Sequence, residues 1–233
     1  MSVFGAGAHA PEDETWLSVS DLMAGLMIVF LFIAVIYIRP IAKRQDEVRQ
    51  VAVAFDQAEA RIVEALEAEF EGDLEKWDAE IDREALIVRF KAPDVLFARG
   101  DAALRPEFED ILDDFFPRYA RILAAHADNV EEVRIEGHTS SDWARGATRD
   151  EAFFGNMAFS QARTRTVLAH ALGTVSDDEQ RTWLRSVVTA NGLSSSRPFE
   201  TEGKEDPKRS RRVEFRVRTD AKRQMVRILE TLE

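Results

Sequence analysis

The longest run of apolar positions extends from Leu17 to Ile38 and contains a single charged residue, Asp21. As a helix, these 22 residues would be roughly 33 Å long, enough to cross a hydrocarbon core of about 30 Å. A cleaved signal peptide would begin with basic residues and end at small ones. Here residues 1–16 contain neither Lys nor Arg, and the run ends in Tyr37, Ile38, Arg39 and Pro40. The pattern predicts an uncleaved transmembrane helix at 17–38, preceded by an N-terminal tail at 1–16.

Residues 39–80 carry a second helical pattern. Apolar side chains recur every three or four positions, at Val48, Val51, Phe55, Ala58, Ile62, Ala65 and Leu66. Residues 45–80 hold twelve acidic and three basic residues, a net charge of −9. A helix face this acidic would be repelled by an anionic membrane surface. The pattern therefore predicts an amphipathic helical linker that packs on a copy of itself or on the following domain.

Beyond Gly72 the pattern is mixed. Short apolar or alternating runs predict strands, at 85–90, 130–135, 187–190 and 213–217. Helical periodicity appears at 107–127, 159–172 and 177–184, and Pro117 is expected to kink or split the first of these helices. This order predicts an α/β sandwich over residues 81–219, followed by a short C-terminal helix at 220–233.

Composition and charge narrow the range of functions. Apolar residues make up 45% of the chain, which is enough for a packed core. The absence of cysteine excludes disulfides, thiolate zinc sites and cysteine nucleophiles. The net charge of −12 argues against nucleic-acid binding, because that binding relies on Lys and Arg to neutralise phosphates. The basic run Lys208–Arg212 is accordingly interpreted as a solvated loop before the last strand.

No catalytic pattern stands out. The four histidines lack metal-ligand spacing (His9, His126, His138 and His170). The sequence contains no P-loop, no GxSxG, no HExxH and no dinucleotide-binding fingerprint. We therefore expect a protein that is not an enzyme and holds no metal or organic cofactor.

Asp21 is the main candidate for chemistry in the apolar run. A charged residue at the centre of a transmembrane helix costs about 2.5–3.5 kcal/mol, and less near its end. An intramembrane carboxylate is by default a proton or cation acceptor that faces a partner or a wet cavity. Ser18, Ala24 and Gly25 share its stripe, and small residues there would let another helix approach closely. The alternative is that Asp21 caps the helix at the membrane interface beside Ser18 and Ser20.

The segment from Ser20 to Phe32, SDLMAGLMIVFLF, resembles the transmembrane signature of MotB-like stator subunits of ion-driven motors. With its preceding Trp16, it is most similar to the MotB-like subunits of Zorya anti-phage systems. The resemblance implies that Asp21 accepts a transported H⁺ or Na⁺, with no other cofactor. It also implies a homodimer surrounded by a ring of MotA-like multi-span subunits.

Four blocks in the second half are similar to the OmpA-like peptidoglycan-binding domain: Val95–Pro106, Ile135–Thr139, Asn156–Arg163 and Arg211–Phe215. In that family an aspartate after the Gly-x-Thr turn and a helix arginine grip the diaminopimelate of the wall peptide. The charges suit this ligand, because a carboxylate meets its ammonium group and a guanidinium meets its carboxylate. His138 would be a turn residue of this motif.

Carried onto this chain, the resemblance makes Thr139, Ser140, Asp142, Asn156 and Arg163 the candidate peptidoglycan contacts. Arg163 matches the family arginine, whereas Ser140 stands where the aspartate is expected. Asp142 would restore the carboxylate if the loop folds back. The alternatives are a surface role for Arg163 near Asp150 or Glu151, and helix capping for Asn156 and Ser160.

The flanks of the apolar run oppose the topology that the resemblance implies. Basic residues follow it (Arg39, Lys43, Arg44 and Arg49) and acidic residues precede it (Glu12, Asp13 and Glu14), which would place the C-terminal domain in the cytoplasm. A wall-binding domain has its ligand in the periplasm, so we expect a single-pass inner-membrane protein with a cytoplasmic N-terminus. The expected function is a wall-anchored motor subunit in phage defence. The alternatives are a flagellar-type stator or a passive envelope tether.

Overall fold

A computed structural model of the chain describes residues 12–91, 96–98 and 100–220. The described chain divides into two units, the first ending at Val51 and the second beginning at Ala52. Three predicted parts lie wholly or partly outside the described residues: residues 1–11 of the tail, Val95 and Arg99 of the first OmpA-like block, and residues 221–233 of the C-terminal helix.

The N-terminal unit contains the first part of helix α1 (Glu12–Phe70). Among the described residues, Val19–Asp46 is the one helical stretch long and apolar enough to cross a membrane, by length and composition. Its large apolar side chains are exposed, among them Leu22, Met27, Phe30, Leu31 and Ile36. Such a surface is unfavourable in water and suits lipid or other apolar helices.

The rest of α1 belongs to the second unit, which begins at Ala52. Ala58, Ile62, Val63, Leu66 and Phe70 are buried in its core. The acidic helix was predicted to pack either on a copy of itself or on the following domain. The part of it from Ala58 to Phe70 packs on the following domain. The unit therefore starts well before the predicted boundary at residue 81.

A five-stranded sheet forms the centre of this unit, in the order β1-β2-β7-β3-β4. The strands are β1 (Ala79–Asp82), β2 (Ile87–Phe90), β3 (Val130–His138), β4 (Val188–Gly192) and β7 (Arg212–Thr219). β3 and β4 are parallel, and the other neighbours are antiparallel. β1 was not predicted, whereas the other four strands overlap the predicted ones.

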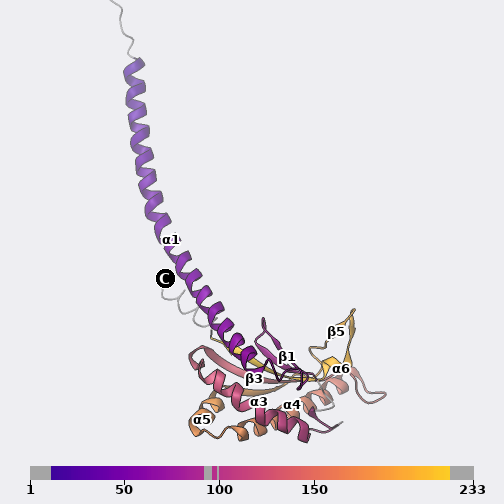
Figure 1. Ribbon diagram of the computed structural model, residues 1–233. Coiled ribbons are helices and arrows are strands. Elements are labelled where there is room, and N and C mark those ends of the chain that lie inside the picture. Colours follow the sequence, from indigo (N-terminus) through magenta and orange to yellow (C-terminus); the bar gives the residue numbers. More distant parts are fainter. Residues whose placement is uncertain (1–11, 92–95, 99, 221–233) are drawn as a thin grey trace, which may run out of the picture. The chain divides into compact units, whose positions relative to one another are not determined.

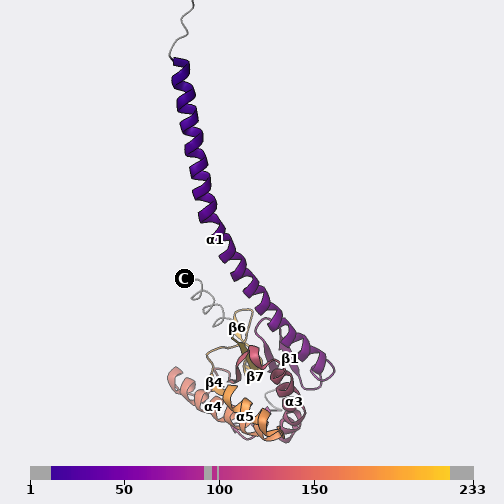
Figure 2. The same cartoon turned by 90° about the vertical axis from the view of Figure 1, so that its left-hand side faces the viewer.

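Helices α3 (Pro106–Ala124), α4 (Arg149–Thr174) and α5 (Asp178–Val187) lie together on one face of the sheet (Figures 1 and 2). Shorter elements complete the unit: η1 (Ala127–Asn129), α6 (Pro207–Ser210) and a hairpin of β5 (Glu200–Thr201) and β6 (Lys204–Glu205). α3 is not split at Pro117, although an internal proline costs a helix about 3 kcal/mol. The burial of Phe115, Phe116 and Tyr119 on either side of Pro117 offsets this cost.

The two faces of the sheet differ in chemistry. On β7, Val213, Phe215 and Val217 belong to the apolar core, and Phe215 contacts the Phe115 ring of α3 at 5.1 Å between centroids. The alternate positions on the same strand, including Glu214 and Arg216, carry ion pairs on the opposite face. This alternation makes the unit a two-layer α/β sandwich with one apolar core.

Candidate functional site

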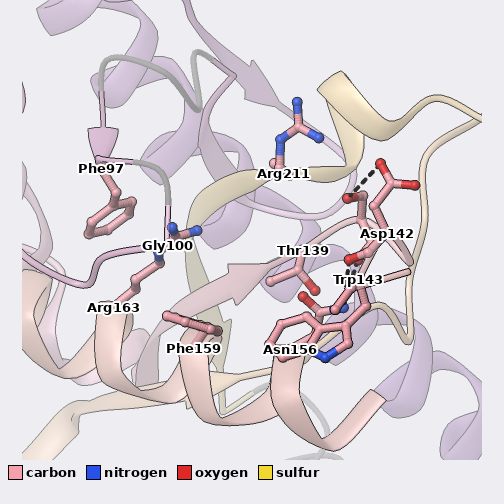
Figure 3. A pocket seen from close by; sticks show the side chains of 11 residues that line it. Phe97, Gly100, Thr139, Asp142, Trp143, Asn156, Phe159, Arg163 and Arg211 are labelled. Carbon is pink, nitrogen blue, oxygen red and sulfur yellow. Dashed lines mark hydrogen bonds between the residues drawn. The ribbon is translucent and has the colours of Figure 1, made fainter. Parts of the chain in front are cut away.

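A cavity of about 590 Å³ opens beyond the end of β3, beside α4. All five predicted wall contacts line it, together with other side chains that the sequence did not single out for binding (Phe97, Gly100, Trp143, Ala144, Phe159 and Arg211) (Figure 3). Its volume lies within the range of about 300–1,000 Å³ that is typical of ligand pockets.

Thr139 and Ser140 follow directly on β3 and form the inner part of the pocket. β3 lies so close to α4 that a Cβ at position 137 would be only 2.7 Å from Thr164 Cγ2. Gly137 makes this approach possible because it has no Cβ. The Thr139 amide donates to the carbonyl of Ser194 at 2.9 Å. Its hydroxyl is buried and has no hydrogen-bond partner among the described residues. A ligand in the pocket would supply one.

Asn156 lies inside the N-terminal half of α4, which begins at Arg149 with a capping box formed by Thr148 and Glu151. The Asn156 Nδ2 donates to the carbonyls of Ser140 at 3.1 Å and Asp142 at 3.3 Å. Ser160, one turn later, accepts from the Ser194 amide at 3.1 Å. Capping was therefore the wrong interpretation for Asn156 and Ser160, because both lie inside the helix.

Arg163 is half-buried, with its Nε 2.8 Å from the Asp101 carbonyl and its Nη2 3.4 Å from the Ala98 carbonyl. Its guanidinium lies 4.8 Å from the Phe97 ring centroid. Burial lowers the pKa of Arg163, Asp101 opposes this shift and Arg211 adds to it. The alternative of a surface cation beside Asp150 or Glu151 is therefore wrong.

Asp142 lines the same pocket as Arg163, so the loop does bring a carboxylate back to the site. Ser140 Oγ lies 3.5 Å from Asp142 Oδ2, at the outer limit of a hydrogen bond. Figure 3 shows Asp142 and Arg163 at opposite ends of the pocket, with Arg211 above them. The arrangement can receive a ligand that carries an ammonium group and a carboxylate some distance apart.

The basic run Lys208–Arg212 is not a solvated loop throughout. Arg212 is buried, and its Nε lies 2.7 Å from Glu214 Oε1. Arg209 lies over the Phe199 ring, 3.7 Å from its centroid, and Arg211 lines the pocket. The sequence signal for Arg211 was its place at the entry to the closing strand.

His138 is the last residue of β3 and is buried, so its interpretation as a turn residue is wrong. Its Nε2 lies 3.4 Å from Glu214 and 3.8 Å from Glu136, and the three side chains are close enough to hold a metal ion. Four arginines already pair with the two carboxylates, however: Arg89, Arg197, Arg212 and Arg216. A further cation is unfavourable among so many positive charges.

Asp21 lies nine residues after the first residue of α1 and is exposed. A residue so far inside a helix is not its N-cap, so the capping alternative is wrong. Ala24 and Gly25 follow at helical spacing and are also exposed, and a Cβ at Gly25 would meet no atom within 4 Å. The side chain of Ser18 lies outside those described.

Over 220 residues the chain is 48% identical to the Zorya protein ZorB of Escherichia coli strain Crooks, and the match covers 94% of each chain. A crystal structure of a MotB-like protein from Desulfovibrio vulgaris covers 71% of this chain and 97% of its own, with a TM-score of 0.52 and 22% identity. This likeness concerns the fold alone, and it agrees with the predicted fold class.

One further structural similarity is too weak to support an argument, because its TM-score is below 0.5. The cell wall anchor of the type VI secretion system from Pseudomonas aeruginosa has a TM-score of 0.46 and 26% identity, covering 66% of this chain and 96% of its own. No protein-family model matches the chain.

Proposed function

Because the chain belongs to the ZorB family of Zorya proteins, we propose that it is the wall-anchored subunit of a proton- or sodium-driven inner-membrane motor in anti-phage defence. The observation that carries this proposal is the identity of 48% over 94% of both chains. So extensive a match includes both the apolar helix and the α/β domain.

Asp21 is the ion acceptor of the proposed motor. A carboxylate in the apolar segment is costly when charged, and binding H⁺ or Na⁺ neutralises it. Moving one charge across 100 mV supplies about 2.3 kcal/mol, and this is the energy source of the proposed cycle. No other cofactor takes part, and the protein is not an enzyme.

The exposed apolar side chains around Asp21 support a partner within the membrane. Two copies of the chain pair and present Asp21 to a surrounding ring of MotA-like, ZorA-like multi-span subunits. Cycling between the charged and neutral states of Asp21 turns one component against the other. The N-terminus is cytoplasmic and the α/β domain lies in the periplasm.

The α/β domain holds the dimer to peptidoglycan through the pocket at the end of β3. Asp142 at one end suits the ammonium group of diaminopimelate, and Arg163 and Arg211 suit carboxylates. Thr139 and Asn156 shape the space between them. Because Ser140 stands where the family has an aspartate, Asp142, two residues later, supplies the carboxylate.

Phage plaquing tests the motor, on cells carrying the native operon with wild type, Asp21→Asn or Asp46→Asn. Asp46 is a matched control, because it is exposed on the same helix at the far end of the apolar stretch. Asp21→Asn is expected to abolish protection at unchanged membrane abundance, whereas Asp46→Asn keeps it. If cells carrying Asp21→Asn are still protected from phage, Asp21 is not the ion acceptor and the protein is a passive tether.

Co-sedimentation with purified sacculi tests the tether, with the full chain in detergent. Arg163→Ala is expected to lose most of its wall binding. Arg165→Ala, an exposed arginine on the same helix that does not line the pocket, keeps it. Equal retention of both variants would remove the pocket from the proposal.

A further inference from the structure

Trp143 forms an aromatic wall of the pocket. Its ring lies beside that of Phe159, with 5.7 Å between centroids, and Figure 3 shows the two on the same side of the pocket. Of Trp143, 39% remains exposed at this wall, so the ring is accessible from the pocket. Aromatic side chains that line a pocket are a common contact surface for a ligand.

The position of Trp143 is fixed from the α4 side. A Cβ at Gly155 would be 2.2 Å from Trp143 Cζ2 and 2.6 Å from Cη2, so the ring rests where only glycine leaves room. This contact makes Trp143 a firm platform in the wall of the pocket.

The two residues that precede Trp143 in the loop are also anchored. The Asp142 carbonyl accepts from Asn156 Nδ2 at 3.3 Å, and the amide of Ser141 donates to Glu205 Oε1 at 2.9 Å. A platform held in this way loses little conformational entropy on binding, which favours affinity.

Polar groups stand around this platform. The buried Thr139 hydroxyl has no partner among the described residues, and the Asp142 carboxylate has one weak contact, at 3.5 Å. A flat aromatic ring bordered by unused hydrogen-bonding groups suits a pyranose. The C–H face of the sugar packs on the ring, while its hydroxyl and acetamido groups meet the polar rim.

We propose that Trp143 is a stacking platform for an N-acetylated sugar of the wall glycan, so that the pocket binds sugar and stem peptide together. This assignment rests on the proposed wall-binding function and deepens it. Arg163 and Arg211 take the peptide, and Trp143 with Thr139 takes the sugar to which the peptide is attached.

Two soluble probes test this assignment on the full chain in detergent, by calorimetric titration. One is the disaccharide tripeptide that ends in diaminopimelate, and the other is the same tripeptide with an acetylated N-terminus, which keeps the charges equal. We expect the sugar to improve wild-type affinity by about two- to tenfold, the range of one aromatic stacking contact. Trp143→Ala removes this gain and leaves the tripeptide affinity within about twofold, whereas Trp143→Phe keeps part of it.

Phe154→Ala is the matched control, because Phe154 is 67% exposed and does not line the pocket. It is expected to keep the full gain. Equal wild-type affinity for both probes would overturn the sugar platform and leave wall binding intact. The same conclusion would follow if Trp143→Ala still bound the disaccharide tripeptide more tightly than the acetylated tripeptide. Failure of wild type to bind either probe would instead remove the wall-binding function, and the platform with it.

Discussion

The side-chain amide of Asn156 donates a hydrogen bond to the main-chain carbonyl of Ser140, with 3.1 Å between nitrogen and oxygen. The same nitrogen reaches the Asp142 carbonyl, and Asn156 is buried. A single side chain in the N-terminal half of α4 therefore fixes the loop that presents Ser140 and Asp142 to the pocket. Neither the loop nor the helix alone would define the site.

Asn156→Asp keeps the size of the side chain and replaces its donor group by a carboxylate that faces two carbonyls. We expect a loss of about 1–3 kcal/mol in the free energy of unfolding, measured with urea, and weaker binding to sacculi. The control is Asn191→Asp, whose amide donates to Thr189 Oγ1 in an exposed contact and which should cost less than about 0.5 kcal/mol. Equal costs for the two variants would contradict the role given to Asn156.

Gly155→Ala tests the contact between α4 and Trp143. Alanine is the better helix former by about 0.8–1 kcal/mol, yet its Cβ would overlap the indole ring. We expect a net destabilisation of about 1–3 kcal/mol from overpacking, measured by urea unfolding.

Gly173→Ala on the same helix is the control, because a Cβ there meets no atom within 4 Å and should stabilise slightly. When Trp143→Ala is already present, adding Gly155→Ala should not lower the free energy of unfolding further, because the indole ring is absent. If the cost persists without the indole, the clash is not its cause.

Glu205→Ala tests how the β5–β6 hairpin supports the pocket. Glu205 accepts hydrogen bonds from the amide and the hydroxyl of Ser141, which adjoins Asp142. Because this contact is exposed, its loss should cost less than about 1 kcal/mol of stability. Binding to sacculi should nevertheless weaken, because the loop around Asp142 and Trp143 loosens. Glu200→Ala, an exposed residue on the same hairpin, is the control and should bind as wild type does.

β3 and β7 could be predicted because they alternate apolar and charged residues, and β2 because it is a short apolar run. On β7, Val213, Phe215 and Val217 face the core while the residues between them form ion pairs. β1 alternates in the same way, but its four residues, Ala-Glu-Ile-Asp, are too short a run to stand out from the acidic segment before it. Its Glu80 and Asp82 are paired by Arg89 of the neighbouring strand, a contact that only the folded sheet creates.

The pocket was harder to predict than the fold. The start of α4 was placed ten residues too late, although Thr148 and Glu151 formed a visible capping-box signal. This error made Asn156 resemble a cap, whereas its partners are carbonyls of a loop 14 and 16 residues earlier. Trp143 and Arg211 reach the pocket from segments that converge only in the folded chain, and apart from the position of Arg211 before the closing strand no local pattern indicates this.

The buried acidic pair Glu136 and Glu214 should make stability depend on pH in the acid range. Burial alone would raise the pKa of each carboxyl, but His138 and the surrounding arginines outweigh this effect and hold both pKa values below the ordinary 4.5. The stabilisation is therefore complete above about pH 4.5 and is lost as the pH falls through the lower native pKa values. Urea unfolding between pH 7 and pH 3 should show this loss.

Glu214→Gln isolates the contribution of Glu214 to this loss. At pH 7 it leaves the buried Arg212 without its carboxylate partner and removes one of the three carboxylates around Arg89, which should cost about 3–5 kcal/mol. Because the missing carboxylate can no longer be protonated, the variant should lose less stability than wild type between pH 5 and pH 3. Glu71→Gln, at an exposed position, is the control and should follow the wild-type curve. A Glu214→Gln curve parallel to that of wild type would show that other carboxylates cause the acid sensitivity.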